Sequence, residues 1–287
     1  MKISVIKSDM ILVLAAVIWG FGFVAQKEGM EHIGPFAFNA LRFALGALVV
    51  LCIALIKDRK KIAKITRTDL SKGILTGFIL FLASSFQQAG LVYTTAGNAG
   101  FITGIYVVLV PALGFLFWKQ KTGKLLLIGT FLATVGLYLL NINSEINIKY
   151  GDLLVLVSAF FWAYHVILIG KFAPKMSAFV LAMLQFSFCS IFSLVLSFLR
   201  ETTTINSITS SSYSILYGGL FSVGIAFTLQ AIGQKKAPPA HAAIIMSLEA
   251  LFAVIGGCLV LSEVITTRIL IGCAFMLCGM FLSQVRD

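Results

Sequence analysis

The sequence predicts an all-α polytopic membrane protein in which ten transmembrane helices form two inverted five-helix repeats. The first observation behind this prediction is the composition, because 59% of the 287 residues are hydrophobic and only 11% are charged. A soluble domain would be roughly a quarter charged. The second observation is that the chain matches itself after a shift along the sequence. The third is the placement of Lys and Arg between the apolar runs, which reports topology.

The internal repeat extends over the whole chain without a gap. A shift of 143 positions places Asp9, Trp19, Gln87, Gly90, Gly129 and Gly136 on Asp152, Trp162, Gln230, Gly233, Gly272 and Gly279. We therefore expect a first five-helix repeat over residues 1–145 and a second over residues 146–287. Because each repeat contains an odd number of helices, the second copy is inverted relative to the first, as in many secondary transporters.

Ten apolar runs have about the 20 residues that a helix needs to cross the hydrocarbon core. In chain order they cover approximately residues 9–26, 36–56, 73–92, 96–118, 124–142, 152–170, 177–199, 213–233, 239–261 and 267–284. The first run follows two lysines, as in a signal peptide, but no small-residue cleavage site leads into a soluble region, so we expect a retained helix. The connections are short, which places the function within the bilayer.

Lys and Arg concentrate in alternate connections between these runs. With the N-terminus inside, 17 of the 22 fall in cytoplasmic segments, Arg42 falls within the second run, and the outside segments hold Lys27, Lys149, Arg200 and Arg268. Because positively charged loops stay cytoplasmic, both termini are predicted to be cytoplasmic. The net charge of +11 therefore reports topology. The charges form no basic face, so nucleic acid is not an expected partner.

The cysteines and the recurring small residues predict no further kind of site. All five cysteines fall within apolar runs without CxxC spacing, so we expect no disulfide framework, no metal site and no cofactor. Small residues recur along several runs, as at Gly129 and Gly136, and allow helices to pack closely in lipid. Ordinary packing explains them better than a dimer contact, so we expect a functional monomer.

Glu249 is the most informative polar residue within the apolar runs. It lies halfway along the ninth run, and its repeat partner Tyr106 lies halfway along the fourth. An ionisable side chain costs about 2.5–3.5 kcal/mol at the centre of a membrane helix, so its presence needs a reason. The functional interpretation is a carboxylate that carries a proton or pairs with a cationic group of the substrate. The alternative is a protonated structural Glu that bonds to Ser247, Tyr106 or a backbone carbonyl.

Arg42 is the second ionisable residue within a run. It lies six residues into the second run, about 9 Å deep at 1.5 Å per residue. The functional interpretation is a fixed positive charge that clamps a substrate carboxylate or phosphate. The alternative is a long side chain that snorkels to the outer interface.

Further polar residues fall in repeat-related pairs, namely Arg42 with Gln185, Gln87 with Gln230, Asn98 with His241, and Gly22 with His165. Helix direction places Arg42, Gln87 and Gln88 toward the outside and Gln185, Gln230 and His165 toward the inside. The result is a polar path with Glu249 and Tyr106 between its ends. Each of these residues has the alternative of an ordinary interhelical hydrogen bond, and His165 that of a structural core histidine.

Aromatic residues and prolines complete the predicted site. Trp19 and Trp162 occupy the equivalent first and sixth runs, away from the lipid interface where tryptophan usually gathers. With Phe21, Phe23, Phe161 and Tyr164 they could wall a cavity for an apolar or aromatic group, and simple packing is the alternative. Pro111 is expected to kink the fourth helix near Tyr106, and Pro239, after Pro238, to open the ninth, so both are hinge candidates.

Several motifs carry a family resemblance over essentially the whole chain. They are Ile18-Trp19-Gly20, Ala40-Leu41-Arg42-Phe43, the run from Tyr93 to Thr103, Ser247-Leu248-Glu249 and Leu261-Ser262-Glu263. Together with two five-helix repeats, they resemble the EamA-type family of the drug/metabolite transporter superfamily. The family usually has Pro after the Glu of the ninth helix, whereas this chain has Ala250. We therefore expect Pro111 and Pro239 to provide the only helix breaks.

The resemblance implies a carrier of small metabolites in the bacterial inner membrane, often an exporter of amino acids or related compounds, working without ATP. The leading hypothesis is a secondary transporter that alternates access around Glu249 and Tyr106, with proton coupling through Glu249. An uptake permease of the same fold is the alternative. A membrane enzyme is not expected, because the sequence has no HExxH, GxSxG or paired intramembrane aspartates. The expected partners are a small-molecule substrate and the lipid bilayer.

Overall fold

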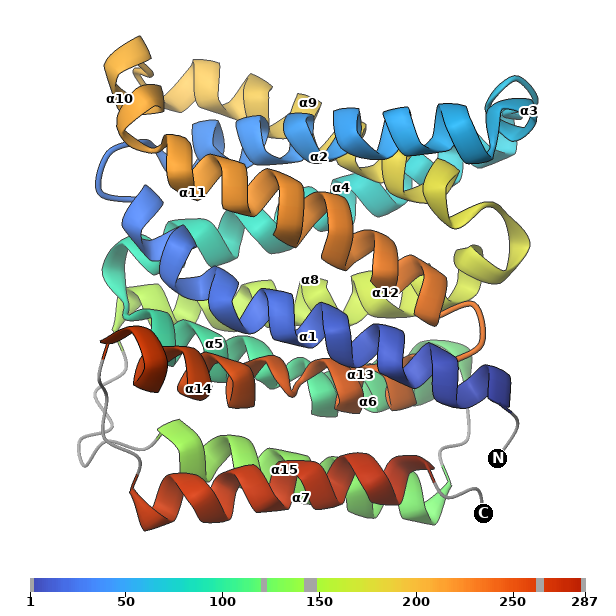
Figure 1. The fold of residues 1–287 in the computed structure, drawn as a ribbon, viewed down its shortest axis with the longest axis vertical. Coiled ribbons are helices and arrows are strands. Elements are labelled where there is room, and N and C mark those ends of the chain that lie inside the picture. Colours follow the sequence, from blue (N-terminus) through green and yellow to red (C-terminus); the bar gives the residue numbers. More distant parts are fainter. Residues whose placement is uncertain (1–2, 120–122, 142–148, 262–265, 285–287) are drawn as a thin grey trace.

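The computed structural model describes residues 3–119, 123–141, 149–261 and 266–284, and every regular element within these ranges is a helix (Figure 1). The main helices of the first half are α1 (Ile3–Gly29), α2 (Pro35–Lys57), α3 (Arg59–Ile62), α4 (Arg67–Tyr93), α5 (Ala96–Gly104), α6 (Tyr106–Trp118) and α7 (Lys124–Asn141). Two residues named above, Ser262 and Glu263, lie outside the described ranges.

The second half contains α8 (Tyr150–Phe172), η1 (Ala173–Lys175), α9 (Ala178–Arg200), α10 (Ile205–Ser210), α11 (Ser212–Leu216), η2 (Tyr217–Phe227), α12 (Thr228–Gly233), α13 (Pro239–Met246), α14 (Glu249–Leu261) and α15 (Thr267–Gln284). Here η1 is a 3₁₀-helix and η2 is a π-helix. The segments α11, η2 and α12 follow one another without a gap and form one continuous rod in Figure 1.

Eight described helical segments are long and apolar enough to span a membrane, so the chain is a multi-pass helical membrane protein. They are Ile6–Gly29, Pro35–Lys57, Arg67–Tyr93, Ala96–Phe117, Tyr150–Lys175, Ala178–Arg200, Ser212–Gly233 and Thr267–Gln284. The two remaining apolar runs form the shorter helices Lys124–Leu140 and Pro239–Ile255. The ten predicted runs are therefore all helical in their described parts, and the count of ten spans stays a prediction.

Local sequence explains where several helices begin. Pro35 occupies the first turn of α2, where its missing N–H costs nothing. The free N–H groups of Phe36 and Ala37 donate to the carboxylate of Glu201, at 2.9 and 2.8 Å. This contact joins the start of α2 to the end of α9. At the start of α4, Thr66 and Asp69 cap one another's backbone N–H groups.

Helices α7 and α15 pack against one another in antiparallel directions through glycines. A Cβ atom added to Gly129 would lie 2.8 Å from the carbonyl oxygen of Gly279, and one added to Gly136 would lie 2.6 Å from that of Gly272. The 143-position shift relates Gly129 to Gly272 and Gly136 to Gly279. Each contact is therefore the image of the other under a two-fold rotation, which is the packing that an inverted repeat predicts.

The same relation holds between α4 and α8 on one side and α1 and α12 on the other. A Cβ atom on Gly90 would lie 2.8 Å from the carbonyl oxygen of Gly151, and one on Gly233 would lie 3.2 Å from that of Ser8. The shift carries Gly90 to Gly233 and Ser8 to Gly151. Equivalent helices thus meet through equivalent positions, although the boundary between repeats at residues 145 and 146 stays a prediction.

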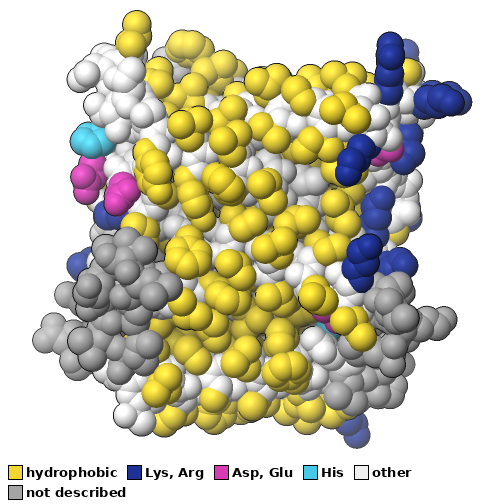
Figure 2. Space-filling model, in the orientation of Figure 1, with side chains coloured by type: hydrophobic (Ala, Val, Ile, Leu, Met, Phe, Trp, Pro, Cys, Tyr) yellow, Lys and Arg dark blue, Asp and Glu magenta, His cyan; other side chains and the backbone are white. Residues whose placement is uncertain are grey.

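Charge and hydropathy divide the molecular surface into a belt and two ends. Figure 2 shows hydrophobic side chains across the middle of the visible face and most Lys and Arg side chains at one end. Both termini lie at that end in Figure 1. His241 ties them together, since its ring contacts Asp9 near the start of α1 at 2.9 Å and the Ser283 carbonyl near the end of α15 at 3.0 Å. This charge asymmetry is the basis for the predicted cytoplasmic location of both termini.

The fourth and ninth membrane helices are each interrupted, but not at the predicted prolines. Ile105 separates α5 from α6, and Ser247 and Leu248 separate α13 from α14. At both places i→i+3 backbone hydrogen bonds replace the α-helical pattern, as from Leu248 N–H to the Ile245 carbonyl at 3.2 Å. These positions are again 143 apart. Such a turn of 3₁₀-helix within an α-helix often marks a hinge.

The expectation that Pro111 and Pro239 provide the only breaks is therefore wrong. Pro111 lies inside α6, which continues past it to Trp118. Pro239 occupies the first turn of α13, where proline starts a helix rather than interrupting one. The interruptions fall immediately before Tyr106 and Glu249, the first residues of α6 and α14.

The crossed α7–α15 contact can be tested with a matched pair of glycine substitutions. Gly136→Ala should destabilise the protein by about 1–3 kcal/mol, because its Cβ would lie 2.5 Å from Met276 Cγ and 2.6 Å from the Gly272 carbonyl oxygen. In the control Gly100→Ala the nearest atom, in the Phe23 ring, is 3.8 Å away. The thermal midpoint in nanodiscs should fall for the first variant only. Equal midpoints would contradict the described packing.

Candidate functional site

A central cavity of about 50 Å³ lies among the helices, with room for a few water molecules. Each half of the described chain contributes seven lining residues. The first half provides Trp19, Phe23, Gln26, Arg42, Gln87, Thr103 and Tyr106, and the second provides Trp162, Val166, Ser222, Phe227, Gln230, Met246 and Glu249. We call this group the central cavity below.

The lining residues are related by the internal repeat. Five pairs are separated by 143 positions: Trp19 with Trp162, Phe23 with Val166, Gln87 with Gln230, Thr103 with Met246, and Tyr106 with Glu249. The central cavity therefore lies where the two repeats face one another. Arg42, Gln26, Ser222 and Phe227 have no lining partner at the equivalent position, so they break the symmetry.

Seven of the eight predicted site residues line the central cavity, and His165 does not. The His165 side chain is fully buried, and its Nε2 lies 2.8 Å from Gln185 Oε1. Its ring packs edge-on against Trp162 and Phe227, at centroid distances of 6.0 and 6.1 Å. His165 thus supports the cavity wall from behind, in agreement with its structural interpretation.

Glu249 and Tyr106 begin the two helical segments that follow the interruptions. Glu249 is 5% exposed, its side chain interacts with that of Tyr106, and its Oε1 has no hydrogen-bond partner among the described residues. Gly20 on α1 lies close to the Glu249 backbone, because a Cβ added to this glycine would lie 2.7 Å from the Glu249 carbonyl oxygen. Helix α1 therefore packs directly against the start of α14.

Arg42 points into the protein rather than toward the lipid interface. Its side chain is 2% exposed, so the snorkelling alternative is wrong. The guanidinium donates from Nε to Asn39 Oδ1 and from Nη1 to Gln26 Oε1, both at 2.9 Å. It also lies 5.0 Å from the centroid of the Phe43 ring, a cation–π distance. No acidic side chain in the described part of the chain forms an ion pair with it.

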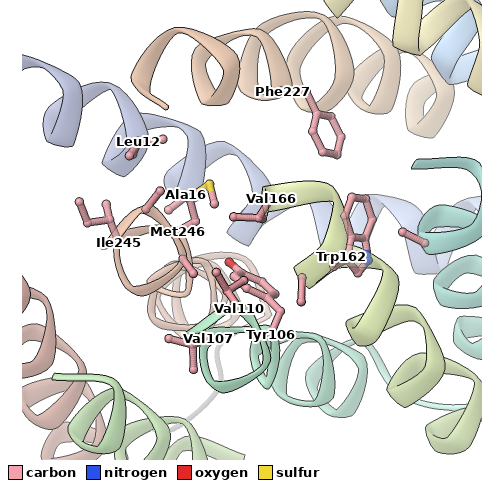
Figure 3. Packing of buried hydrophobic residues seen from close by; sticks show 14 of the residues in the cluster. Leu12, Ala16, Tyr106, Val107, Val110, Trp162, Val166, Phe227, Ile245 and Met246 are labelled. Atoms are coloured by element: carbon pink, nitrogen blue, oxygen red, sulfur yellow. The ribbon is translucent and has the colours of Figure 1, made fainter. Parts of the chain in front are cut away.

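Phe227 joins the aromatic residues of the central cavity into one wall. Its ring stacks on that of Trp162 at a centroid distance of 5.7 Å and an angle of 13° (Figure 3). It also lies 4.8 Å from the Trp19 ring. Two phenylalanines from α2 and α9, Phe43 and Phe186, also contact it, at centroid distances of 6.2 and 6.1 Å. The predicted aromatic wall was therefore partly right: of its six residues, Trp19, Trp162 and Phe23 line the cavity and Phe21, Phe161 and Tyr164 do not.

The glutamine side chains of the cavity are bound to neighbouring groups. Gln87 donates to Thr103 Oγ1 at 2.8 Å, and both residues line the cavity. Gln230 donates to Gln234 Oε1 at 3.0 Å, which leaves its own Oε1 buried without a partner among the described residues. The third glutamine, Gln26, donates to the Gly22 carbonyl at 3.2 Å. The predicted Asn98–His241 pair takes no part, because neither residue lines the cavity.

Sequence reasoning missed six of the fourteen described lining residues, and helical spacing could have found part of them. Gln26 follows Trp19 at i+7 and Phe23 at i+3, so all three share one face of α1. Val166 follows Trp162 at i+4 in the same way. Ser222 and Phe227 had no such signal, because they belong to the π-helix η2, whose wider turns do not follow the α-helical period. The Ser222 carbonyl accepts the indole N–H of Trp19 at 3.3 Å.

Known sequences resemble this chain along its length. The model of a family described as the EamA-like transporter family matches residues 6–142 and 149–284. An uncharacterised transporter of Archaeoglobus fulgidus is 35% identical over 280 residues, which cover 97% of this chain and 86% of that protein. A probable amino-acid metabolite efflux pump of Salmonella typhimurium is 26% identical over 166 residues, or 55% of this chain and 51% of that protein.

A solved crystal structure shares the fold. It superimposes with a TM-score of 0.81 and covers 96% of both chains, at 17% sequence identity. At this identity the likeness concerns the fold alone. The helix arrangement described here is therefore one that a natural protein adopts.

Phe227 is expected to hold the cavity wall together. Phe227→Ala should destabilise the protein by roughly 3 kcal/mol, because it removes a buried ring that contacts both tryptophans. It should also shift the tryptophan fluorescence. The control Phe198→Ala changes a ring that is 80% exposed and should alter neither quantity. Thermal unfolding and emission spectra of both variants in nanodiscs provide the comparison, and unchanged spectra for Phe227→Ala would contradict the described wall.

Proposed function

The chain belongs to the EamA-like transporter family, and on that premise we propose that it is a secondary carrier that exports amino acids or related small metabolites by alternating access. Membership of the family makes it a membrane transporter, with the lipid bilayer and a small-molecule substrate as its partners. The observation that carries the finer proposal is the central cavity, which receives seven described lining residues from each half of the chain.

The symmetry of the cavity supports alternating access. Two inverted halves that meet at one site can rock relative to one another and expose that site to either side of the membrane. The interruptions at Ile105 and at Ser247–Leu248 lie beside the cavity and supply equivalent hinges in the two halves. The described cavity admits only a few water molecules, so binding of a metabolite requires the halves to separate.

The proposed cargo and direction are supported by one relative and by the lining. The Salmonella protein is named a probable amino-acid metabolite efflux pump, and it matches 55% of this chain. The lining combines an aromatic wall with a buried cation and a buried carboxyl group, which suits a small molecule with both apolar and polar parts. We place the carrier in the bacterial inner membrane and expect it to work as a monomer, since each chain contains both halves of the site.

Proton coupling is assigned to Glu249. It is the only acidic residue that lines the cavity within the described chain, and its Oε1 is buried without a partner there. A carboxyl group in such surroundings can be neutral while the site is closed and can release its proton when water enters. The proton gradient would then drive an exchange in which the proton crosses the membrane in one direction and the cargo crosses it in the other.

Counterflow tests the carrier proposal directly. Proteoliposomes that contain the purified protein and a high internal concentration of unlabelled amino acids should transiently concentrate an external labelled amino acid. A carrier that exchanges one molecule for another produces this overshoot, and an open channel does not. Empty liposomes are the control. Absence of counterflow with amino acids and with a broader mixture of metabolites would overturn the proposal.

The role of Glu249 is tested by replacing its ionisable carboxyl group with an amide of nearly the same shape. Glu249→Gln should abolish the acceleration of transport by a proton gradient, whereas counterflow should persist at a reduced rate, because glutamine keeps an acceptor oxygen. The control Glu28→Gln changes an exposed carboxylate at the end of α1 and should keep its response to the gradient. Proton-driven flux that is unchanged in Glu249→Gln would place the coupling elsewhere.

A further inference from the structure

We propose that the central cavity recognises its cargo as a zwitterion in one fixed orientation, with the cargo carboxylate on Arg42 and the cargo amino group on Glu249 and Gln230. This inference rests on the carrier function proposed above and adds the binding residues and the orientation of the cargo. Four polar groups of the cavity carry it, namely a buried cation and three side chains that each have a buried polar atom without a partner among the described residues. Two of them call for an anion or acceptor, and two call for a donor.

Arg42 is the group that calls for an anion. A buried guanidinium is costly unless an anion or several acceptors surround it. Here it has two amide oxygens, Asn39 Oδ1 and Gln26 Oε1, and no acidic side chain in an ion pair within the described chain. The two bonds hold the planar group by Nε and Nη1 and so fix its orientation at the cavity. A carboxylate is the partner that best matches a guanidinium fork.

The indole of Trp162 adds a second donor. Its Nε1 is buried without a hydrogen-bond partner among the described residues, and Trp162 lines the cavity. Its repeat partner Trp19 differs, since the Trp19 indole N–H already donates to the Ser222 carbonyl. Only one of the two equivalent tryptophans therefore has an indole N–H without a partner among the described residues.

The groups that call for a donor are Glu249 and Gln230. Glu249 Oε1 and Gln230 Oε1 are both buried and have no partner among the described residues. Both residues line the same cavity as Arg42. An ammonium group provides three N–H donors and a positive charge, and it can satisfy both oxygens at once. Buried polar atoms without partners are uncommon in native proteins, so a pair of acceptors in one cavity needs an explanation.

The two poles belong to one cavity. Arg42 and Glu249 both line it, so one small ligand in the cavity can face both residues. A ligand that meets both poles carries an anionic and a cationic group, and an α-amino acid has both on one carbon atom.

Broken symmetry gives the site a single polarity. The repeat partner of Arg42 is Gln185, which is fully buried and bonds to His165 behind the cavity wall. The partner of Glu249 is the neutral Tyr106. One cationic and one acidic residue therefore line the cavity in the described chain, one from each repeat. A phosphate would leave Glu249 without a cation, and a simple amine would leave Arg42 without an anion. A ligand with charge of one sign therefore meets only one of the two residues.

Ligand truncation tests this proposal on the wild-type protein in nanodiscs. The twenty proteinogenic amino acids are first ranked by thermal stabilisation. The strongest ligand is then compared with its decarboxylated amine and with its deaminated acid. Each truncated ligand should bind about 10- to 100-fold more weakly, the loss expected for charge-assisted hydrogen bonds. Equal binding of either truncated form, or no stabilisation by any amino acid, would overturn the proposal.

Matched variants assign the poles. In Arg42→Gln, the amino acid and its amine should bind equally, because the variant loses the carboxylate site. In Glu249→Gln, the amino acid and its deaminated acid should become equal instead. The control Arg200→Gln removes an exposed cation at the end of α9 and should keep the full preference. A preference for the zwitterion that survives Arg42→Gln would overturn the assignment of the carboxylate.

The two proposals fail in different ways. Counterflow of other metabolites without any binding of amino acids would leave the carrier function intact and overturn the zwitterion site. Binding with the expected discrimination, but without counterflow in proteoliposomes, would overturn the carrier function and support the site. The truncation series needs no substitution, so it decides the question even where Arg42→Gln does not fold.

Discussion

Lipid offers no hydrogen bonds to a backbone, and this constraint governs the whole molecule. Each N–H and C=O group in the bilayer needs an internal partner, so the described chain is helical almost throughout. Irregular backbone is tolerated only where protein or a cavity surrounds it. The interruptions at Ile105 and at Ser247–Leu248 obey this rule, since each is followed directly by a residue of the central cavity. Even there, i→i+3 bonds keep the backbone paired.

Helices in lipid gain little from the hydrophobic effect when they associate, so close contact between small residues takes its place. The crossed glycine contacts of α7 with α15 show this, and they also reveal the two-fold relation between the repeats. The same relation brings Tyr106 and Glu249 to one cavity. Symmetry thus locates the site, whereas chemistry depends on the positions where the repeats differ. Arg42 and Phe227 are such positions, and they provide the buried cation and the centre of the aromatic wall.

Much of the candidate site could be found from sequence, because the repeat offset compares each position with its counterpart. Trp19 with Trp162, Gln87 with Gln230 and Tyr106 with Glu249 were paired in this way, and all six line the cavity. Other lining residues escaped notice. Phe227 is the clearest example, since one of many phenylalanines in apolar runs gives no sign that both tryptophans pack against it.

The sequence by itself determined the helical membrane class, the order of the apolar runs and the internal repeat, because these follow from hydropathy and from residue identity along the chain. Only the tertiary structure decided where the side chains point. Arg42 could have reached the lipid interface from its depth, yet Gln26 and Asn39 hold it inward. Prolines likewise suggested helix breaks that lie elsewhere. Side-chain direction depends on which neighbours offer hydrogen bonds and space, and those neighbours come from distant parts of the chain.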